Sequence, residues 1–290
     1  MYRIVSSADN NLVVKMDDFN PSHTFLCGQC FRWNQEDEQT WSGVALGRFV
    51  RLKWDGENCT FFNMTEKEFQ DKWVHYFDLE TDYGRIKEIL ANKDEHLKKA
   101  VSFGYGIRLL RQELWEMLLS FIISQNNLIP RIKKIIETLS EHYGEKIPGT
   151  DNRYAFPDPG SLARSTIEEL NVCRGGYRLK YILSAAERLS ESPGLLDEMK
   201  SLPAGKAREM LLSFTGVGEK VADCILLYSG LDRNAFPIDR WVKRVMETLY
   251  FGKETDVKTI RAFSREYFGE YSGIAQQYLF YYARENRIGL

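Results

Sequence analysis

The hydrophobic pattern of the chain changes near residue 105, and this change limits the folds that the chain can adopt. Before it, aromatic and β-branched runs at 25–33, 40–54 and 58–64 are separated by Asn, Asp and Gly, which is typical of strands. After it, apolar residues recur at helical spacing, as in Leu114, Met117, Leu118, Phe121 and Ile122. The pattern predicts an α+β fold, with an antiparallel sheet domain over residues 1–104 and mostly helical domains over residues 105–290.

Local signals add detail to this division. Helical spacing predicts helices near 66–75 and 83–99 within the first domain. Ser165 and Glu168 match a capping box, which predicts that another short helix begins there.

Composition places the chain among ordinary soluble proteins. Of its 290 residues, 43% are hydrophobic and 28% are charged, and no apolar run reaches the ~18 residues of a membrane helix. The N-terminal segment lacks the apolar core of a signal peptide. We therefore expect an intracellular protein that is not associated with a membrane.

Charge is distributed unevenly along the chain. The formal net charge is −2, with 13 basic and 17 acidic residues in residues 1–100 and 26 basic and 24 acidic residues after them. This small basic excess is not the signature of a strongly basic nucleic-acid-binding domain. A polyanionic partner would have to be bound through a few placed side chains and backbone N–H groups.

The cysteines do not form a recognisable framework. They are five in number and scattered, which fits a reducing compartment better than a set of disulfides. Cys27 and Cys30 form a CxxC motif and leave a redox function open as an alternative, although their strand-like surroundings are not the usual context of such motifs. No second CxxC or His pair completes the four ligands of a zinc site.

The segment 211–242 carries the pattern most indicative of chemistry. An apolar helix end is followed by a tight turn, Gly216-Val217-Gly218, and Lys220 then lies in the first turn of the next helix. A lysine is nucleophilic only as the neutral amine, and the positive potential at a helix N-terminus disfavours the cation. The backbone N–H groups of the turn would also bind a phosphate. The alternative is a lysine that simply points into water.

These motifs resemble the helix-hairpin-helix-GPD superfamily of DNA glycosylases and, within it, the 8-oxoguanine DNA glycosylases. The resemblance covers nearly the whole chain and rests on GQCFRW (28–33), WSGV (41–44), GIRLLRQ (106–112), SQNNLIPRI (124–132), GGYRLKYI (175–182), VGEKVADCI (217–225), PID (237–239) and GIAQQYLF (273–280). It implies a TATA-binding-protein-like sheet domain followed by helical domains, with the helix-hairpin-helix at about 204–230. It also implies an enzyme that removes 8-oxoguanine opposite cytosine and cleaves the abasic site by β-elimination.

The resemblance assigns catalytic roles to two residues. Lys220 is the implied nucleophile, which forms a Schiff base with the sugar C1′. Asp239 is the implied acidic partner, which stabilises the developing positive charge and can also cap the helix that follows it. Gly216, Val217 and Gly218 form the implied phosphate-binding turn.

Further implied roles concern the two bases of the damaged pair. A glycine carbonyl accepts the N7–H that only the oxidised base carries, and an aromatic ring and a glutamine bind the flipped base. The lesion-recognition set is Gly28, Cys224, Gln276 and Phe280. The set for the opposite cytosine is Asn126, Arg131 and Arg178, with Tyr177 as the wedge. Each also has a structural alternative, such as a strand-bend glycine, a core aromatic or a solvated arginine.

Three positions depart from the family pattern. Thr215 stands where the hairpin usually carries Pro. Trp241 and Ala283 stand where eukaryotic relatives carry a His and an acidic residue, so a phosphate contact of those relatives is not carried over.

The resemblance also bears on cofactors and partners. No cofactor is required, the iron–sulfur cysteines of endonuclease III relatives are absent, and a monovalent or calcium ion is an option at the backbone carbonyls of Leu212, Phe214 and Val217. The implied partner is double-stranded DNA containing 8-oxoguanine, bound by a monomer in the nucleoid-associated cytoplasm of a prokaryote or the nucleus of a eukaryote. Two alternatives stay open: a glycosylase for another oxidised or alkylated base, and a non-catalytic helix-hairpin-helix DNA-binding module.

Overall fold

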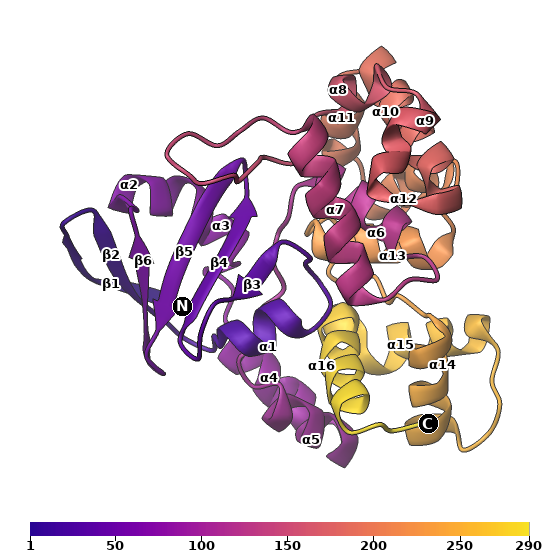
Figure 1. The fold of residues 1–290 in the computed structure, drawn as a ribbon. Helices are drawn as coiled ribbons and strands as arrows, with labels where there is room; N and C mark the ends of the chain where they lie inside the picture. The colour runs from indigo at the N-terminus through magenta and orange to yellow at the C-terminus, as the bar shows by residue number, and fades with distance from the viewer. Residues whose placement is uncertain (290) are drawn as a thin grey trace. The chain divides into compact units, whose positions relative to one another are not determined.

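A computed structural model describes residues 1–289, which group into two compact units (Figure 1). Unit 1 comprises residues 1–29, residues 54–111 and the chain from Asp232 onward, and unit 2 comprises residues 30–53 and 112–231. The division into domains 1–104 and 105–290 stays a prediction beside this grouping by contact. No helix among residues 1–289 combines the length and the apolar character needed to cross a bilayer.

The strands form an antiparallel sheet, which confirms the fold class predicted for the N-terminal part. Unit 1 contributes β1 (Tyr2–Ala8), β2 (Asn11–Met16) and β6 (Asn58–Phe62), and unit 2 contributes β3 (Trp33–Gln35), β4 (Thr40–Ala45) and β5 (Arg48–Trp54). The strand order is β1-β2-β6-β5-β4-β3. Alternate residues of β2 are buried, which is the two-residue period of a strand covered on one face.

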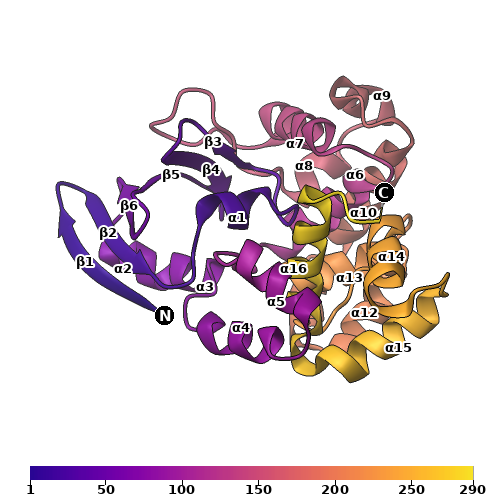
Figure 2. The ribbon, with the colours of Figure 1, turned by 90° about the horizontal axis from the view of Figure 1, so that it is seen from below.

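The rest of unit 1 is mostly helical. Its helices are α1 (Pro21–Leu26), α2 (Glu66–Glu68), α3 (Val74–Tyr76), α4 (Tyr83–Ala91), α5 (Glu95–Phe103), α14 (Arg240–Met246), α15 (Val257–Phe268) and α16 (Ser272–Glu285), with π-helical turns at Phe69–Trp73 and Glu247–Phe251 and a 3₁₀ turn at Gly269–Tyr271. The apolar core includes Phe61, whose ring meets those of Phe69 and Phe77 at centroid distances of 5.1 and 5.9 Å. Figure 2 shows α5 alongside α16, and the two helices pack together.

Two local predictions in unit 1 are wrong. The predicted helix 83–99 is interrupted after α4, because Asp94 accepts a hydrogen bond from the Leu97 N–H and caps a new helix, α5. The run 25–33 is not a strand at its start, since Asn20 caps α1 and Pro21 occupies its first position. In both places a local capping signal outweighs the hydrophobic pattern.

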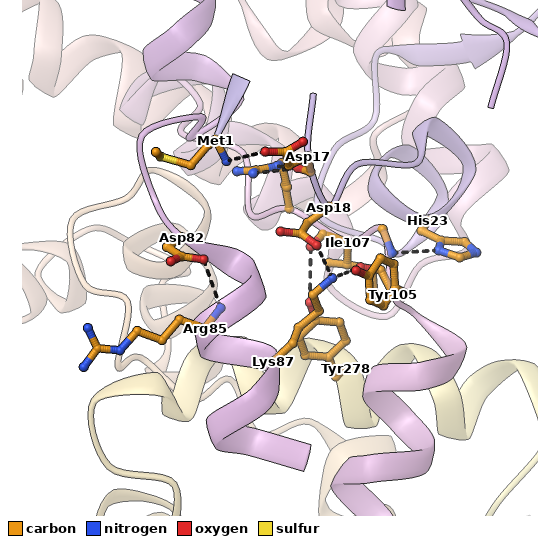
Figure 3. A network of polar contacts seen from close by, with 12 residues as sticks. Met1, Asp17, Asp18, His23, Asp82, Arg85, Lys87, Tyr105, Ile107 and Tyr278 are labelled. Atoms are coloured by element: carbon orange, nitrogen blue, oxygen red, sulfur yellow. Dashed lines mark hydrogen bonds and ion pairs between the residues drawn. The ribbon is translucent and has the colours of Figure 1, made fainter. Parts of the chain in front are cut away.

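A polar network holds the segment that follows α5 (Figure 3). Lys87 Nζ donates to Asp18 Oδ1 at 2.6 Å and to the Tyr105 carbonyl at 3.1 Å. Burial is the largest single influence on the pKa of the Asp18 carboxyl and acts to raise it. The hydrogen bond and charge of Lys87, with smaller contributions from Tyr105 and Arg108, together outweigh burial and lower that pKa below its usual value. His23 Nδ1 accepts the Gly106 N–H at 3.1 Å. These bonds fix the segment against α1 and α4.

Unit 2 is mostly helical. Its helices are α6 (Leu114–Ser124), α7 (Ile129–Tyr143), α8 (Pro159–Ala163), α9 (Ile167–Leu170), α10 (Leu179–Glu191), α11 (Leu195–Ser201), α12 (Ala204–Leu212) and α13 (Glu219–Tyr228), with 3₁₀ turns at Asn171–Cys173 and Gly176–Arg178. The capping box before α9 is formed by Thr166 and Glu169, so the prediction of Ser165 and Glu168 is wrong by one residue.

The interior of unit 2 contains a buried polar cluster. Arg32 Nη2 donates to the Tyr154 carbonyl at 2.6 Å and lies 3.7 Å from the Glu137 carboxylate. Glu116 on α6 is also buried, and burial raises the pKa of its carboxyl to about 7, although the charge of Arg32 acts in the opposite direction. Glu116 therefore titrates near neutral pH inside the folded protein.

Replacing Glu116 with glutamine is expected to flatten the pH dependence of stability. In the unsubstituted protein, Glu116 ionises near its usual pKa when the chain is unfolded but only near 7 when it is folded. The free energy of unfolding therefore falls as the pH rises between these values, by at most about 3 kcal/mol, and the variant lacks this loss. Urea denaturation between about pH 5 and pH 8 measures the difference. The exposed Glu141→Gln is the matched control, and equal pH slopes in both variants would contradict the assignment.

Candidate active site

Two helices joined by a tight turn, α12 and α13, occupy the predicted hairpin segment of unit 2. Gly216 has φ = +82°, and a Cβ there would lie 2.5 Å from the Tyr181 ring, so both the backbone conformation and the packing require glycine. Gly218 directly precedes α13 in an extended conformation with open space beside it. The Gln125 side-chain amide donates to the Gly216 carbonyl at 3.0 Å and attaches the turn to the loop before α7.

Lys220 is the second residue of α13, as predicted, and is half-buried. Its Nζ lies 5.5 Å from the centroid of the Phe121 ring, which itself stacks on Tyr228 at 5.3 Å. Cys224 follows one helical turn later and is buried. The amine is thus held beside an aromatic surface, immediately after the Gly-Val-Gly turn.

The loop between α6 and α7 is organised by the backbone carbonyl of Gln125. This oxygen accepts the Tyr177 hydroxyl at 3.3 Å and Arg178 Nε at 2.9 Å, and it also contacts Arg178 Nη2. Arg178 Nη2 donates in addition to the Asn126 carbonyl at 3.0 Å. Asn126 has φ = +48°, a conformation that asparagine tolerates better than most residues. Arg178 is therefore buried, and its guanidinium is bound to the loop that carries Asn126.

Large side chains are exposed around this loop. The Tyr177 residue is 48% exposed, and the Arg178 guanidinium lies 4.5 Å from its ring centroid. Arg131 is exposed as well, and its Nη2 donates to the Arg174 carbonyl at 3.3 Å. Leu128, which sequence reasoning did not single out, is 77% exposed at the start of α7. Apolar and cationic groups thus gather on one surface of unit 2.

In unit 1, Gly28 lies against α16. Its φ of +93° requires glycine, and a Cβ there would lie 3.5 Å from Phe280 Cε1, which is an ordinary contact. Gln276, one turn before Phe280 on the same helix face, is 3% exposed. Within residues 1–289, Gln276 Oε1 has no hydrogen-bond partner. An acceptor buried without a partner costs about 1–3 kcal/mol, so its place beside an aromatic ring indicates a binding surface.

The neighbouring Gln29 holds the Gly28 loop in position. Its amide donates to the carbonyls of Thr24 and Arg108, each at 2.8 Å, and its Oε1 accepts the Leu110 N–H at 2.8 Å. This fully buried side chain therefore ties three backbone segments together next to Gly28.

Asp239 also belongs to unit 1, where it caps α14. Its Oδ1 accepts the Val242 N–H at 2.8 Å, and the residue is half-buried. Trp241, two residues later, has a buried indole Nε1 that lacks a hydrogen-bond partner in the part of the chain described. Ala283 is completely buried. The helix cap predicted for Asp239 is thus present.

The predicted residues divide into two sets. Unit 2 holds Lys220, Cys224, the hairpin turn and the residues expected to bind the opposite cytosine, and unit 1 holds Asp239, Gly28, Gln276 and Phe280. Sequence reasoning missed Gln125, whose only signal is its place before Asn126. It also missed Arg284, whose signal is its spacing of four residues from Phe280.

The backbone carbonyl oxygens of Leu212, Phe214 and Val217 are the kind of ligand that a hard cation prefers. Neutral backbone oxygens suit a potassium or calcium ion, and the Phe214 carbonyl retains one lone pair while it accepts the Val217 N–H at 3.0 Å. No group of three or more His, Cys, Asp or Glu residues that could hold a metal ion occurs in residues 1–289. A metal held by acidic or sulfur ligands is therefore not supported within that range.

The CxxC cysteines do not have the character of a redox pair. Burial raises the pKa of the Cys27 thiol to about 11, which disfavours the reactive thiolate. All five cysteines are buried, and none of them forms a disulfide within residues 1–289. A redox function for Cys27 thus finds no support in its surroundings.

Family models match most of the chain. Residues 11–118 match "8-oxoguanine DNA glycosylase, N-terminal domain", and residues 119–269 match "HhH-GPD superfamily base excision DNA repair protein".

Individual relatives agree with these matches. The chain is 43% identical to the 8-oxoguanine glycosylase/lyase of Clostridium acetobutylicum, with a TM-score of 0.93 over 99% of each chain, in a complex with double-stranded DNA containing cytosine opposite 8-oxoG. It is 36% identical over 267 residues to the N-glycosylase/DNA lyase of Saccharomyces cerevisiae, which covers 82% of this chain and 70% of that protein. It is 29% identical over 247 residues to a probable N-glycosylase/DNA lyase of Methanothermobacter thermautotrophicus, over 78% of each.

Proposed function

The chain belongs to the 8-oxoguanine DNA glycosylases of the HhH-GPD superfamily of base-excision repair proteins, and we propose from this premise that it excises 8-oxoguanine opposite cytosine and then cleaves the strand by β-elimination. It is a bifunctional DNA glycosylase and AP lyase, and DNA is its partner. The observation that carries the proposal is the place of Lys220, a half-buried amine directly after the Gly-Val-Gly turn.

In the proposed reaction, Lys220 acts as the nucleophile. Its neutral amine attacks C1′ of the damaged nucleotide, the C1′–N9 bond breaks, and its electron pair leaves with the base, which takes up a proton. Loss of the amine protons and opening of the sugar ring then give a Schiff base between Nζ and C1′. Removal of a proton from C2′ expels the 3′ phosphate and completes β-elimination. The carboxylate of Asp239 stabilises the positive charge that develops on the sugar.

The two base-recognition sets have separate tasks in this proposal. Phe280 stacks on the flipped lesion, the unpartnered Gln276 Oε1 accepts from its Watson–Crick edge, and the Gly28 carbonyl accepts the N7–H that guanine lacks. Cys224, one helical turn from Lys220 on α13, contacts the flipped base.

The opposite cytosine is bound from the loop of unit 2. Asn126, Arg131 and Arg178 supply its hydrogen bonds, and the exposed Tyr177 ring fills the emptied stack. Because Arg178 now binds backbone carbonyls, it must exchange some of these bonds when cytosine is bound.

Other properties follow from the same proposal. The protein works as a monomer, needs no cofactor for the chemistry and acts where the DNA is, in the nucleoid or the nucleus. A potassium or calcium ion at the carbonyls of Leu212, Phe214 and Val217 would help the hairpin to bind a DNA phosphate.

Borohydride trapping tests the proposed reaction, because it reduces a Schiff base to a stable amine. We expect a covalent adduct with a duplex containing 8-oxoguanine opposite cytosine, little adduct with 8-oxoguanine opposite adenine, and none with undamaged guanine. Gel electrophoresis of the denatured mixtures measures the amount of covalent adduct formed with each duplex. Base release without an adduct would exclude the lysine mechanism. Stronger activity on a duplex with 3-methyladenine would favour the alternative of another damaged base.

A further inference from the structure

Arg284 extends the lesion-binding face of α16. Gln276, Phe280 and Arg284 follow one another at intervals of four residues, so they lie along one side of the helix. The Arg284 guanidinium lies 5.6 Å from the Phe280 ring centroid. Its Nη1 is 3.5 Å from the position of a Cβ on Gly28. The guanidinium thus lies beside both Phe280 and Gly28, at one end of the surface that these two residues form.

The guanidinium is held in place with one nitrogen unused. Nη2 donates to the Leu26 carbonyl at 2.7 Å, and Nε donates to Glu285 Oε1 at 2.9 Å. Nη1 is buried and has no hydrogen-bond partner among the described residues. A neighbouring bond, from Gln277 Nε2 to the Cys27 carbonyl at 3.0 Å, holds the loop and the helix together. Since two nitrogens are anchored, the third is a fixed donor rather than a mobile one.

A buried donor and a buried acceptor therefore lie one helical turn to either side of Phe280 along α16. The donor is Arg284 Nη1, beside Gly28, and the acceptor is Gln276 Oε1. A flipped purine stacked on the ring presents donors along its Watson–Crick edge, which suit the glutamine oxygen. Along its other edge, 8-oxoguanine presents two carbonyl oxygens, O6 and O8, on either side of N7–H. These are the acceptors that Nη1 can satisfy.

We propose that Arg284 is a specificity-determining residue, whose Nη1 donates to a carbonyl oxygen beside N7–H of the flipped lesion. This inference rests on the proposed function and adds a charged donor to the pair formed by Gly28 and Gln276. A charge-assisted bond in a buried site is stronger than a neutral one. A bond to O8 selects directly for the oxidised base, because unmodified guanine has O6 but no oxygen at C8, whereas a bond to O6 selects for a purine with a carbonyl at C6.

A base is a better ligand for this nitrogen than a backbone phosphate. Phosphates are bound at surfaces, whereas Nη1 is buried beside Gly28 and near the stacking ring. The two ligands also differ in their consequences. A contact with the base matters only while the base is attached, whereas a contact with a phosphate also affects DNA from which the base has been lost.

The test compares two substrates for Arg284→Met. Base release from 8-oxoguanine opposite cytosine, measured in a single turnover, is expected to be about 10- to 100-fold slower. Cleavage of a pre-formed abasic site opposite cytosine is expected to change less than about twofold, because that substrate has no base. Arg284→Lys keeps the charge but cannot bond both the Leu26 carbonyl and the base, so most of the loss should remain. The exposed Arg265→Met controls for the lost charge.

Each outcome has a definite meaning. Unchanged base release, or an equal loss on both substrates, would overturn the assignment and favour a phosphate contact or a structural role. If the unsubstituted protein releases no 8-oxoguanine at all, the proposed function fails instead.

A second measurement shows whether O6 or O8 of the lesion accepts the hydrogen bond from Arg284 Nη1. Lys220→Gln protein is used to measure affinity for duplexes with 8-oxoguanine or 8-oxoadenine, whose C6 carries an amino group instead of O6. Adding Arg284→Met should weaken both complexes if O8 is the acceptor and only the first if it is O6. No weakening of either would contradict the proposal.

Discussion

Lys220→Gln is expected to abolish the borohydride-trapped adduct and to slow 8-oxoguanine release by at least roughly a thousandfold. Glutamine cannot attack C1′ or form an imine, so both the base-release and the lyase steps lose their nucleophile. Because Lys220 is only half-buried at the start of α13, the substitution should change the free energy of unfolding of the protein by no more than about 1 kcal/mol. Trapping, single-turnover base release and thermal unfolding measure these effects on the same preparation.

A lysine in the same hairpin serves as the control. Lys206 on α12 is exposed and pairs with Glu209 at 2.9 Å. Lys206→Gln removes the same charge from the first turn of the other helix of the hairpin and should retain the adduct. An adduct formed by Lys220→Gln would show that another amine is the nucleophile.

Asp239→Asn is expected to slow base release by about 10²- to 10⁴-fold and to leave the fold intact. Asparagine is as good a helix cap as aspartate, so the bond to the Val242 N–H is retained while the negative charge is lost. Without that charge, the positive charge developing on the sugar is no longer stabilised. Single-turnover kinetics on 8-oxoguanine opposite cytosine, together with thermal unfolding, measure the two properties separately.

Two further variants separate catalysis from helix capping. Asp239→Ala removes the cap as well and should lower the free energy of unfolding by about 1 kcal/mol more than Asp239→Asn does. Asp256 caps α15 through the Thr259 N–H at 2.9 Å and is exposed, so Asp256→Asn should leave base release unchanged. If Asp239→Asn were fully active and only Asp239→Ala were impaired, helix capping would explain the whole effect.

Much of the fold could be predicted because its signals are local. The alternation of buried residues in β2 and the helical spacing in α6 are properties of a few consecutive residues. The helix start just before Lys220 and the cap at Asp239 depend likewise on neighbours within four positions.

The wrong predictions have a common physical cause. Where two local signals compete, the hydrophobic pattern alone does not say which one prevails. Asp94 ends a helical pattern by capping a new helix, and Pro21 begins a helix inside an aromatic run. At α9, the choice of Thr166 over Ser165 as the cap depends on a one-residue difference in helix start, which is the least reliable part of sequence reasoning.

The sequence by itself determined most of the elements, the hairpin and the position of the candidate nucleophile in the first turn of a helix, because each depends on residues close together in the chain. Tertiary structure alone decided that Gly28 meets Arg284, that Gly216 packs on Tyr181, and that the pKa of Glu116 is raised. These features depend on contacts and burial between distant segments. Periodicity and capping signals do not say which distant residue will contact a given side chain, or which residues will bury it from water.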